Sequence, residues 1–543
     1  MKRLSISSIC GGSCTGRKMM NAFSKGIVAA AGGLLGLNIA CAEVHLAPVF
    51  GSHMVLQRDV PARLVGWADA GETVVVKLGG EVVGNVVGAG KDKPWTIMLP
   101  VQKAGAMQNI VVEGKNRITL THLLAGDVWV CSGQSNMEMS LQKGPWCQYG
   151  GVLHADQEVA AAAYPQIRFY KKGGKDGSWA VCSPESAKSF SAAGYFFGRE
   201  LQSQLKVPIG LVQASAGGTA AESWTPRSAL ETWPGFATAS AKAQKTLDEL
   251  KPIADADGKA MAQWRKDVET AKKEKTPVPP TPARKMTDEQ RDQLHGANAL
   301  IGTGNLYNVL IEPLTTMRIK GAIWYQGESN SRRSSEYAEL MGRLIGGWRK
   351  AWGQADLPFL IMELVNFDFP NYQPWYQKGT FAELRGAQRV VAENVPNVGI
   401  AVGIDIGVAN NIHPPNKQDV GKRLALVALK QVYGQEVVAA GPTVRDARFE
   451  NGKVILDFDP GGKEQRVVFR DNSTNGFELA GADGVFVPAA ADLQENTLVV
   501  TAPGIAAPEA VRYAWADNPP ATLFNTAGLP AAPFQRGKNL KKE

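Results

Sequence analysis

The stretch Trp129-Val-Cys-Ser-Gly-Gln-Ser135-Asn-Met137 decides the fold class, because a run with β character stops at Ser-Gly-Gln-Ser-Asn and a helix is expected after Met137. Such a turn holds the Ser135 hydroxyl clear of its own backbone. The N–H groups that open the following helix would point at any negative charge formed there. Strands that end in Gly and Ser are also common in ordinary connections, so this motif needs support from the rest of the chain.

Three further fragments follow predicted strands in the same way. Ser215-Ala-Gly-Gly-Thr-Ala-Ala-Glu222-Ser-Trp224 is a Gly-rich turn after the apolar run 209–214, where backbone N–H groups can approach a ligand closely. In Ile323-Trp-Tyr-Gln-Gly-Glu-Ser-Asn330 an apolar strand ends in a side-chain amide. Downstream, Asn411-Ile-His413-Pro-Pro-Asn-Lys417 precedes a helical run over 420–432.

Ser, Gly, amide and His in this order resemble the four sequence blocks of the SGNH hydrolases, and most closely the bacterial sialate O-acetylesterases and related carbohydrate acetylesterases. Met54-Val-Leu-Gln-Arg-Asp59 and Val511-Arg-Tyr-Ala-Trp-Ala-Asp-Asn-Pro519 extend the resemblance over about residues 50–534. The resemblance implies a serine esterase that removes O-acetyl groups from sugars through an acetyl-enzyme, with an acetylated carbohydrate as its partner.

The expected nucleophile is Ser135 and the expected general base is His413. Of the six histidines, only His413 follows the last predicted strand and precedes a helix, which is where a Ser-based α/β hydrolase returns its imidazole to the nucleophile. On that helix, Lys417 and Arg423 are expected to face solvent.

The third member of the triad is where the sequence departs from the family pattern. SGNH enzymes commonly carry Asp two or three residues before the His, but here those positions hold Asn411 and Asn410. Asp405, at the end of the last predicted strand, is the nearest acidic alternative. Either Asp405 reaches His413, or the enzyme works as a Ser–His dyad with a neutral orienting group.

The other site residues are expected from the second and third blocks. By resemblance, the N–H of Ser135, an N–H of Gly217 or Gly218 and the amide of Gln326 form the oxyanion hole. Supporting roles are expected for Glu222, Glu328, Asn330 and Asn411. Candidate sugar platforms are Trp224, Trp324 and Tyr325, with core packing an equally open reading. No HExxH motif, Cys/His cluster with metal spacing or phosphate loop occurs in the sequence, so we expect no cofactor and no metal.

The 543 residues, 44% hydrophobic and 20% charged, are too many for one core. Short β runs fill a predicted N-terminal β domain at 43–125, and β patterning returns in a C-terminal region at 435–543. Between them, over 126–434, strands alternate with helices. This predicts an α/β hydrolase domain of the SGNH, flavodoxin-like type, a doubly wound parallel sheet with flanking all-β segments. Residues of about 230–297 interrupt the alternation as a helical insertion, read as a lid or as a solvated appendage.

The first 42 residues are typical of a signal peptide, with five basic and no acidic residues around the apolar run 26–40 and small residues at Ala40-Cys-Ala42. We therefore expect a periplasmic or secreted protein without an integral membrane span. Removing this segment takes away five of the 59 basic residues, against 51 acidic ones, so the mature charge is near +3 and predicts no nucleic-acid partner. Three cysteines remain, either with a Cys147–Cys182 bond or all free.

Two alternatives to an active sugar esterase stay open. The asparagines at the usual Asp positions and the β segments at both ends would also suit a catalytically impaired carbohydrate-binding protein. A lipase or thioesterase of the same fold is the other alternative, although the sequence has no obvious apolar lid.

Overall fold

A computed structural model describes residues 43–173, 176–368, 380–470 and 473–538. Its largest sheet has nine strands, of which seven run parallel to one another. In order across the sheet, the main strands are β12 (Asp176–Cys182), β11 (Tyr164–Gly173), β13 (Ile209–Ser215), β10 (Leu124–Gly133), β14 (Gly321–Tyr325), β15 (Phe359–Met362) and β16 (Val398–Ala401).

The strand order is that of a doubly wound sheet, with β10 between β13 and β14. The five strands β13, β10, β14, β15 and β16 have the flavodoxin-like order, in which the chain direction across the sheet reverses beside β10. The hairpin of β11 and β12 extends this sheet beyond β13. Ligands of such sheets bind outside the carboxyl ends of the strands at this reversal. The turns that follow β10, β13 and β14 therefore lie at one edge of the sheet, as the sequence predicts.

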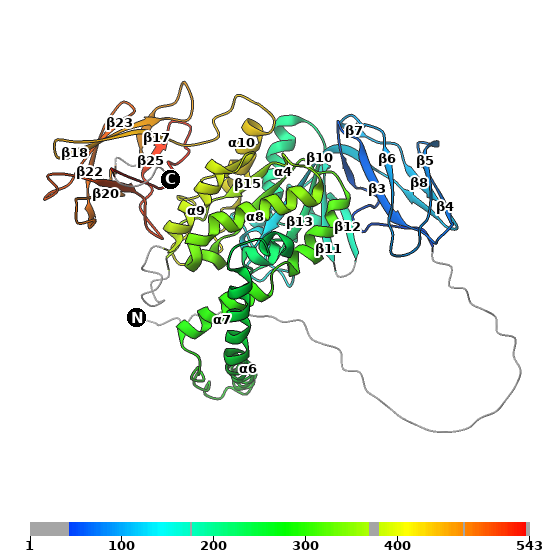
Figure 1. The fold of residues 1–543 in the computed structure, drawn as a ribbon, viewed down its shortest axis with the longest axis horizontal. Helices are drawn as coiled ribbons and strands as arrows, with labels where there is room; N and C mark the ends of the chain where they lie inside the picture. Colours follow the sequence, from blue (N-terminus) through cyan, green and yellow to red (C-terminus); the bar gives the residue numbers. More distant parts are fainter. Residues whose placement is uncertain (1–42, 174–175, 369–379, 471–472, 539–543) are drawn as a thin grey trace, which may run out of the picture. The chain divides into compact units, whose positions relative to one another are not determined.

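Helices cover both faces of this sheet (Figure 1). On one face, Trp129 of β10 packs edge-on against Phe197, with ring centroids 5.1 Å apart. Trp324, which is in register with Ser132 and so lies on the other face, packs against Trp348 with centroids 6.1 Å apart. The helices of the first face are α4 (Ala192–Leu205) and α10 (Lys417–Gln431), and those of the second are α8 (Ser334–Trp352) and α9 (Thr380–Asn394).

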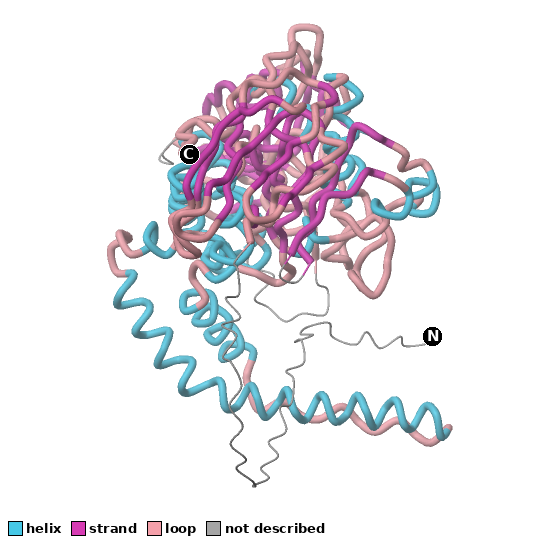
Figure 2. The backbone as a smooth tube through the Cα atoms, turned by 90° about the vertical axis from the view of Figure 1, so that its right-hand side faces the viewer, coloured by secondary structure: helices cyan, strands magenta, loops and turns pink. Residues whose placement is uncertain are grey.

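Two long helices occupy the predicted insertion. They are α6 (Phe236–Glu274) and α7 (Asp288–Ile301), which pack on each other through a small apolar cluster of Ala243, Leu247 and Ala297. Figure 2 shows them as cyan helices beside the magenta strands. Most of α6 is exposed, which explains why its sequence carries charge on most sides.

The N-terminal β segment forms two small sheets and joins the central sheet through β10. The first sheet contains β1 (His45–Leu46), β3 (Ala62–Trp67) and β6 (Trp95–Leu99); the second contains β5 (Glu81–Val87), β4 (Thr73–Leu78), β8 (Ile110–Glu113) and β9 (Arg117–Leu120). The short strands β2 (Val55–Gln57) and β7 (Gly105–Ala106) pair with the first residues of β10.

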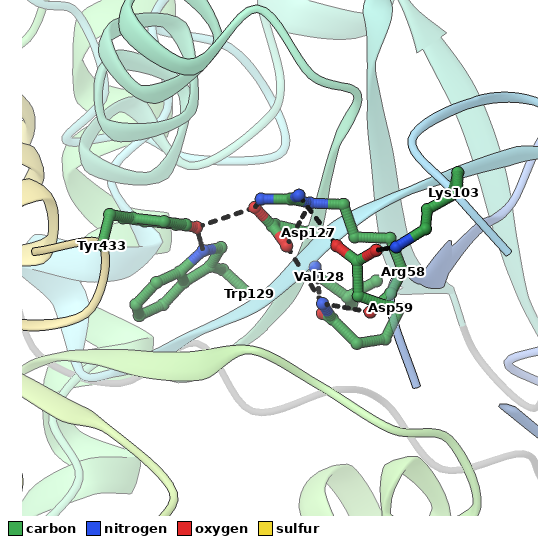
Figure 3. A network of polar contacts seen from close by, with 8 residues as sticks. Arg58, Asp59, Lys103, Asp127, Val128, Trp129 and Tyr433 are labelled. Carbon is green, nitrogen blue, oxygen red and sulfur yellow. Dashed lines mark hydrogen bonds and ion pairs between the residues drawn. The ribbon is translucent and has the colours of Figure 1, made fainter. Parts of the chain in front are cut away.

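A buried carboxylate, Asp127 of β10, fastens this junction (Figure 3). Arg58 donates to both of its oxygens at 3.0 Å, and Gln57 and the Tyr433 hydroxyl also donate to it at 3.0 Å. Trp129 in turn donates to the Tyr433 hydroxyl at 3.2 Å. Residues from the N-terminal β segment, the sheet and the end of α10 thus share one polar network.

The C-terminal β segment has a core of its own, to which Ile404 beside β16 also belongs. One sheet contains β17 (Thr443–Glu450), β18 (Lys453–Asp459), β23 (Thr497–Thr501) and β22 (Ala490–Gln494). A second contains β21 (Phe486–Pro488), β20 (Phe477–Ala480), β24 (Ala510–Tyr513) and β26 (Phe534–Gly537), and β19 (Val467–Phe469) pairs with β25 (Leu523–Asn525).

The described residues bear on the expected cysteine pairing and on the expected lack of a membrane span. Cys131, Cys147 and Cys182 are all buried free thiols, so the Cys147–Cys182 bond does not form here. In the described ranges, no helix is both long and apolar enough to cross a bilayer. The expected signal peptide, residues 1–42, lies outside the described residues.

Candidate active site

The nucleophile turn follows β10 as the sequence predicts, but the helix expected after Met137 is instead the short helix α1 (Ser135–Glu138), which begins at Ser135 itself. Gly133 has a φ of +133°, and a Cβ atom there would lie 2.2 Å from the Tyr325 carbonyl oxygen. Gln134 donates its N–H to that same oxygen at 3.0 Å. The turn is thus pressed against β14, and only glycine fits at position 133. Ser135 is largely buried, with 8% of its surface exposed.

The Gly-rich turn after β13 lies against the nucleophile. A Cβ atom on Gly217 would lie 2.9 Å from the Tyr149 hydroxyl oxygen and 3.4 Å from the Ser135 Cβ, so this glycine lies against both side chains. The Gly217 N–H, however, donates to Glu138 Oε2 at 2.9 Å, and the Tyr149 hydroxyl donates to the same oxygen. Of the expected backbone donors, the N–H groups of Ser135 and Gly218 have no acceptor within the described part of the chain.

His413 lies in the same cluster of loops. Its ring stacks on Tyr149, with centroids 4.4 Å apart and an interplanar angle of 17°, and Tyr149 contacts the turn that carries Gly217. Burial, together with the positive charge of Lys417, lowers the pKa of His413 to about 4. The imidazole is therefore neutral at physiological pH and can accept a proton. In the described ranges its ring nitrogens make no hydrogen bond.

The structure does not bring Asp405 to His413. Both carboxylate oxygens of Asp405 bind the Arg423 guanidinium, at 2.5 and 2.9 Å, and Arg470 lies 3.7 Å away. Among the described side chains, no ion pair within 4.0 Å joins Asp405 to the imidazole. Arg423, expected in solvent, is instead buried and binds the Asp405 carboxylate. Asn411 accepts the backbone N–H of His413 at 2.9 Å, so its contact is with the main chain and not with the ring.

Gln326 is fully buried and both protons of its amide have acceptors. They are the Thr219 carbonyl oxygen at 3.2 Å and Asn330 Oδ1 at 2.7 Å. Asn330 in turn donates to Glu222 at 3.0 Å, and Glu222 also pairs with Arg333. The expected amide donor therefore joins the turns after β13 and β14 in this structure and is not aimed at open space.

The three candidate sugar platforms are in the core. Trp224, Trp324 and Tyr325 are each 0% exposed. The two indole rings pack edge-to-face with centroids 6.0 Å apart, so neither presents a face to a ligand. All three side chains therefore pack in the core. Trp324 lies against Trp348 of α8, whereas Tyr325 lies on the opposite face of the sheet, near Lys417 of α10.

Sequence reasoning missed four residues of the site: Asn136, Glu138, Tyr149 and Lys417. Asn136 follows Ser135 and donates to Glu328 Oε1 at 2.6 Å, so Glu328 supports the turn that carries Ser135. Lys417, expected in solvent, is fully buried and donates to Asn136 Oδ1 at 2.9 Å. Asn136 and Glu138 lie close to Ser135 in the chain, and Lys417 lies close to His413. This nearness was the only sequence signal for their place in the site.

Comparison with solved structures decides the family. The chain is similar to a carbohydrate acetylesterase from Xanthomonas citri, with 31% identity, a TM-score of 0.72, and 91% of this chain and 100% of the other covered. This chain belongs to the carbohydrate acetylesterases. A family model described as carbohydrate esterase, sialic acid-specific acetylesterase matches residues 288–430. The carbohydrate acetylesterase described here is thus a carboxylic ester hydrolase that removes O-acetyl groups.

Animal relatives extend over nearly the same length. This carbohydrate acetylesterase is 28% identical to the sialate O-acetylesterases of Rattus norvegicus and Mus musculus, over 90% of this chain and 94% of each of theirs. Within the described residues, no group of three or more His, Cys, Asp or Glu side chains could hold a metal ion.

Proposed function

We propose that Ser135 is the nucleophile of this carbohydrate acetylesterase and His413 its general base. The observation that carries the proposal is the shared loop cluster, in which the turn of Gly217 touches Ser135 on one side and Tyr149, stacked on His413, on the other. The imidazole accepts the Ser135 proton as Oγ attacks the acetyl carbonyl, and gives it to the departing sugar oxygen. Water, deprotonated by the same ring, then releases acetate from the acetyl-enzyme.

The negative oxygen of the intermediate needs donors that have no other acceptor. Within the described ranges, the N–H groups of Ser135 and Gly218 meet that condition, and we assign the oxyanion hole to them first. Gly217 can join them when the Glu138 carboxylate moves off its N–H. Gln326 contributes by holding Thr219 and Asn330, and donates directly only if those bonds rearrange.

The base works without a carboxylate on its ring. Because Asp405 is bound to Arg423, the supported arrangement is a Ser–His dyad whose imidazole is held by its surroundings. Removing the orienting acid from a triad lowers turnover but leaves the oxyanion hole working, so a dyad of this kind remains an enzyme.

We further propose O-acetylated sialic acid as the substrate class and the periplasm or the outside of the cell as the place of action. Support for the substrate comes from the family model over 288–430 and from the names of the animal relatives. Support for export comes from the composition of residues 1–42.

Acetate release across a panel of acetylated sugars tests both parts. O-acetylated sialic acids should be the fastest substrates, ahead of acetylated xylan and xyloglucan fragments. Ser135→Ala and His413→Ala should each lower turnover at least about a thousandfold on every substrate. Faster release from a neutral glycan would contradict the substrate, and full activity of Ser135→Ala would contradict the chemistry.

A further inference from the structure

A buried ammonium group lies directly behind the base. Lys417 opens α10 and is 0% exposed. Its Nζ donates to Asn136 Oδ1 at 2.9 Å and to the Pro414 carbonyl oxygen at 2.6 Å, and it lies 5.7 Å from the centre of the Tyr325 ring. Burying an ammonium this deep costs folding free energy, which hydrogen bonds and a nearby opposite charge offset only in part.

Asn136 completes a clamp around His413. Its amide donates to the Ile412 carbonyl oxygen at 2.9 Å and to Glu328 Oε1 at 2.6 Å. The carbonyls held by Asn136 and Lys417 therefore belong to Ile412 and Pro414, the residues on either side of His413. Because Asn136 is also the neighbour of Ser135, one pair of bonded side chains fixes the nucleophile turn and both flanks of the base.

The charges of this cluster act on the ring as well. Burial lowers the pKa of Lys417 to about 7, against the opposing effect of the Glu328 carboxylate and Cys147. The Lys417 charge in turn helps to lower the pKa of His413. The other face of the imidazole is covered by Tyr149, whose hydroxyl is bound to Glu138.

We propose that Lys417 and Asn136 are positioning residues that hold His413 in place, as a ring-bound carboxylate does in other serine esterases, while the Lys417 charge keeps the ring in its neutral form. The proposal rests on the Ser135–His413 chemistry above. The clamp holds the backbone on both sides of the ring, and the ammonium disfavours a second positive charge beside it.

Lys417→Met, with Lys422→Met as its control, tests the clamp. Lys422 lies on the same helix and is exposed, so its substitution should leave kcat, KM and the pH profile unchanged. Lys417→Met should lower kcat by about tenfold to a hundredfold with little change in KM, because the base is misplaced and not the substrate. The acid limb of kcat/KM should also move up toward pH 6.5, since a positive charge next to His413 has gone.

Lys417→Gln, which can still hydrogen-bond to Asn136 but carries no charge, is the second variant in case Lys417→Met does not fold. It removes the positive charge beside His413, so the acid limb should move up here too. Unmoved acid limbs in the variants that fold would overturn the proposal, since loss of folded protein lowers kcat without moving a pH profile. If instead Ser135→Ala retained activity in the same assay, the proposed chemistry would fail, which is a separate outcome.

Discussion

At the scale of single residues, the site combines a serine at the turn after β10 with a histidine whose ring binds no carboxylate among the described residues. His413 gains its neutral form from burial and from Lys417, and its orientation from Tyr149 and the bonds to its backbone. A general base must be unprotonated to act, so a lowered pKa widens the pH range of the enzyme on the acid side.

The pH profile of the wild-type enzyme should reflect this environment. We predict that kcat/KM for 4-nitrophenyl acetate stays flat well below pH 6.5 and falls only as the pH approaches about 4 to 5, because protonation of His413 follows its lowered pKa of about 4. Initial rates across pH 3.5 to 9 at constant ionic strength measure the limb. An acid limb at pH 6.5 or above would show that burial and Lys417 do not lower the pKa of His413.

At the scale of elements, Asp405 shows how a plausible catalytic residue becomes a structural one. It follows β16, and it binds Arg423 of α10 with side chains 5% and 8% exposed, so it ties the end of the sheet to the helix that carries Lys417. Ile404 beside it belongs to the core of the C-terminal β segment.

Asp405→Asn should therefore affect stability more than chemistry. We expect turnover per folded active site to fall by less than about tenfold, whereas loss of an orienting acid costs about 10³ to 10⁴. The free energy of unfolding should fall by about 3 kcal/mol or more, because Arg423 loses its buried partner. Fluorophosphonate titration of active sites, run beside thermal unfolding, separates the two. A thousandfold loss per titrated site would restore Asp405 to the triad.

The sequence predicts elements better than it predicts side-chain partners. The apolar run 209–214 forms β13 and the helical run over 420–432 forms most of α10, because unbroken apolar runs and helical periodicity are local signals. The β11–β12 hairpin was not expected, since basic residues interrupt its alternation. The partners of Asp405 and Lys417 lie 18 and 281 residues away, at Arg423 and Asn136, and no local pattern records such pairings.

At the scale of the whole molecule, the N-terminal β segment is joined to the central sheet by a buried charge network. Asp127 is 0% exposed and lies at the start of the sheet part of β10, whose other end carries Ser135. Arg58 supplies its counter-charge, and Tyr433 brings in the end of α10 (Figure 3).

Arg58→Met should destabilise the folded chain by about 3 kcal/mol, because it leaves the Asp127 carboxylate buried without a counter-charge. The exposed pair of Lys103 and Asp59 offers a matched control from the same network, and Lys103→Met should change stability by less than about 0.5 kcal/mol. Urea unfolding followed by tryptophan fluorescence measures both. Equal effects of the two variants would show that the junction does not depend on the buried pair.

Identification of the acylated side chain tests the central claim most directly. The wild-type enzyme is treated with a fluorophosphonate, digested, and its modified peptide is sequenced by mass spectrometry. The Ser135–His413 assignment predicts one adduct, on Ser135, that is absent from Ser135→Ala and forms at least about a hundredfold more slowly in His413→Ala. An adduct on any other serine, or equal labelling rates in the wild-type enzyme and His413→Ala, would contradict it.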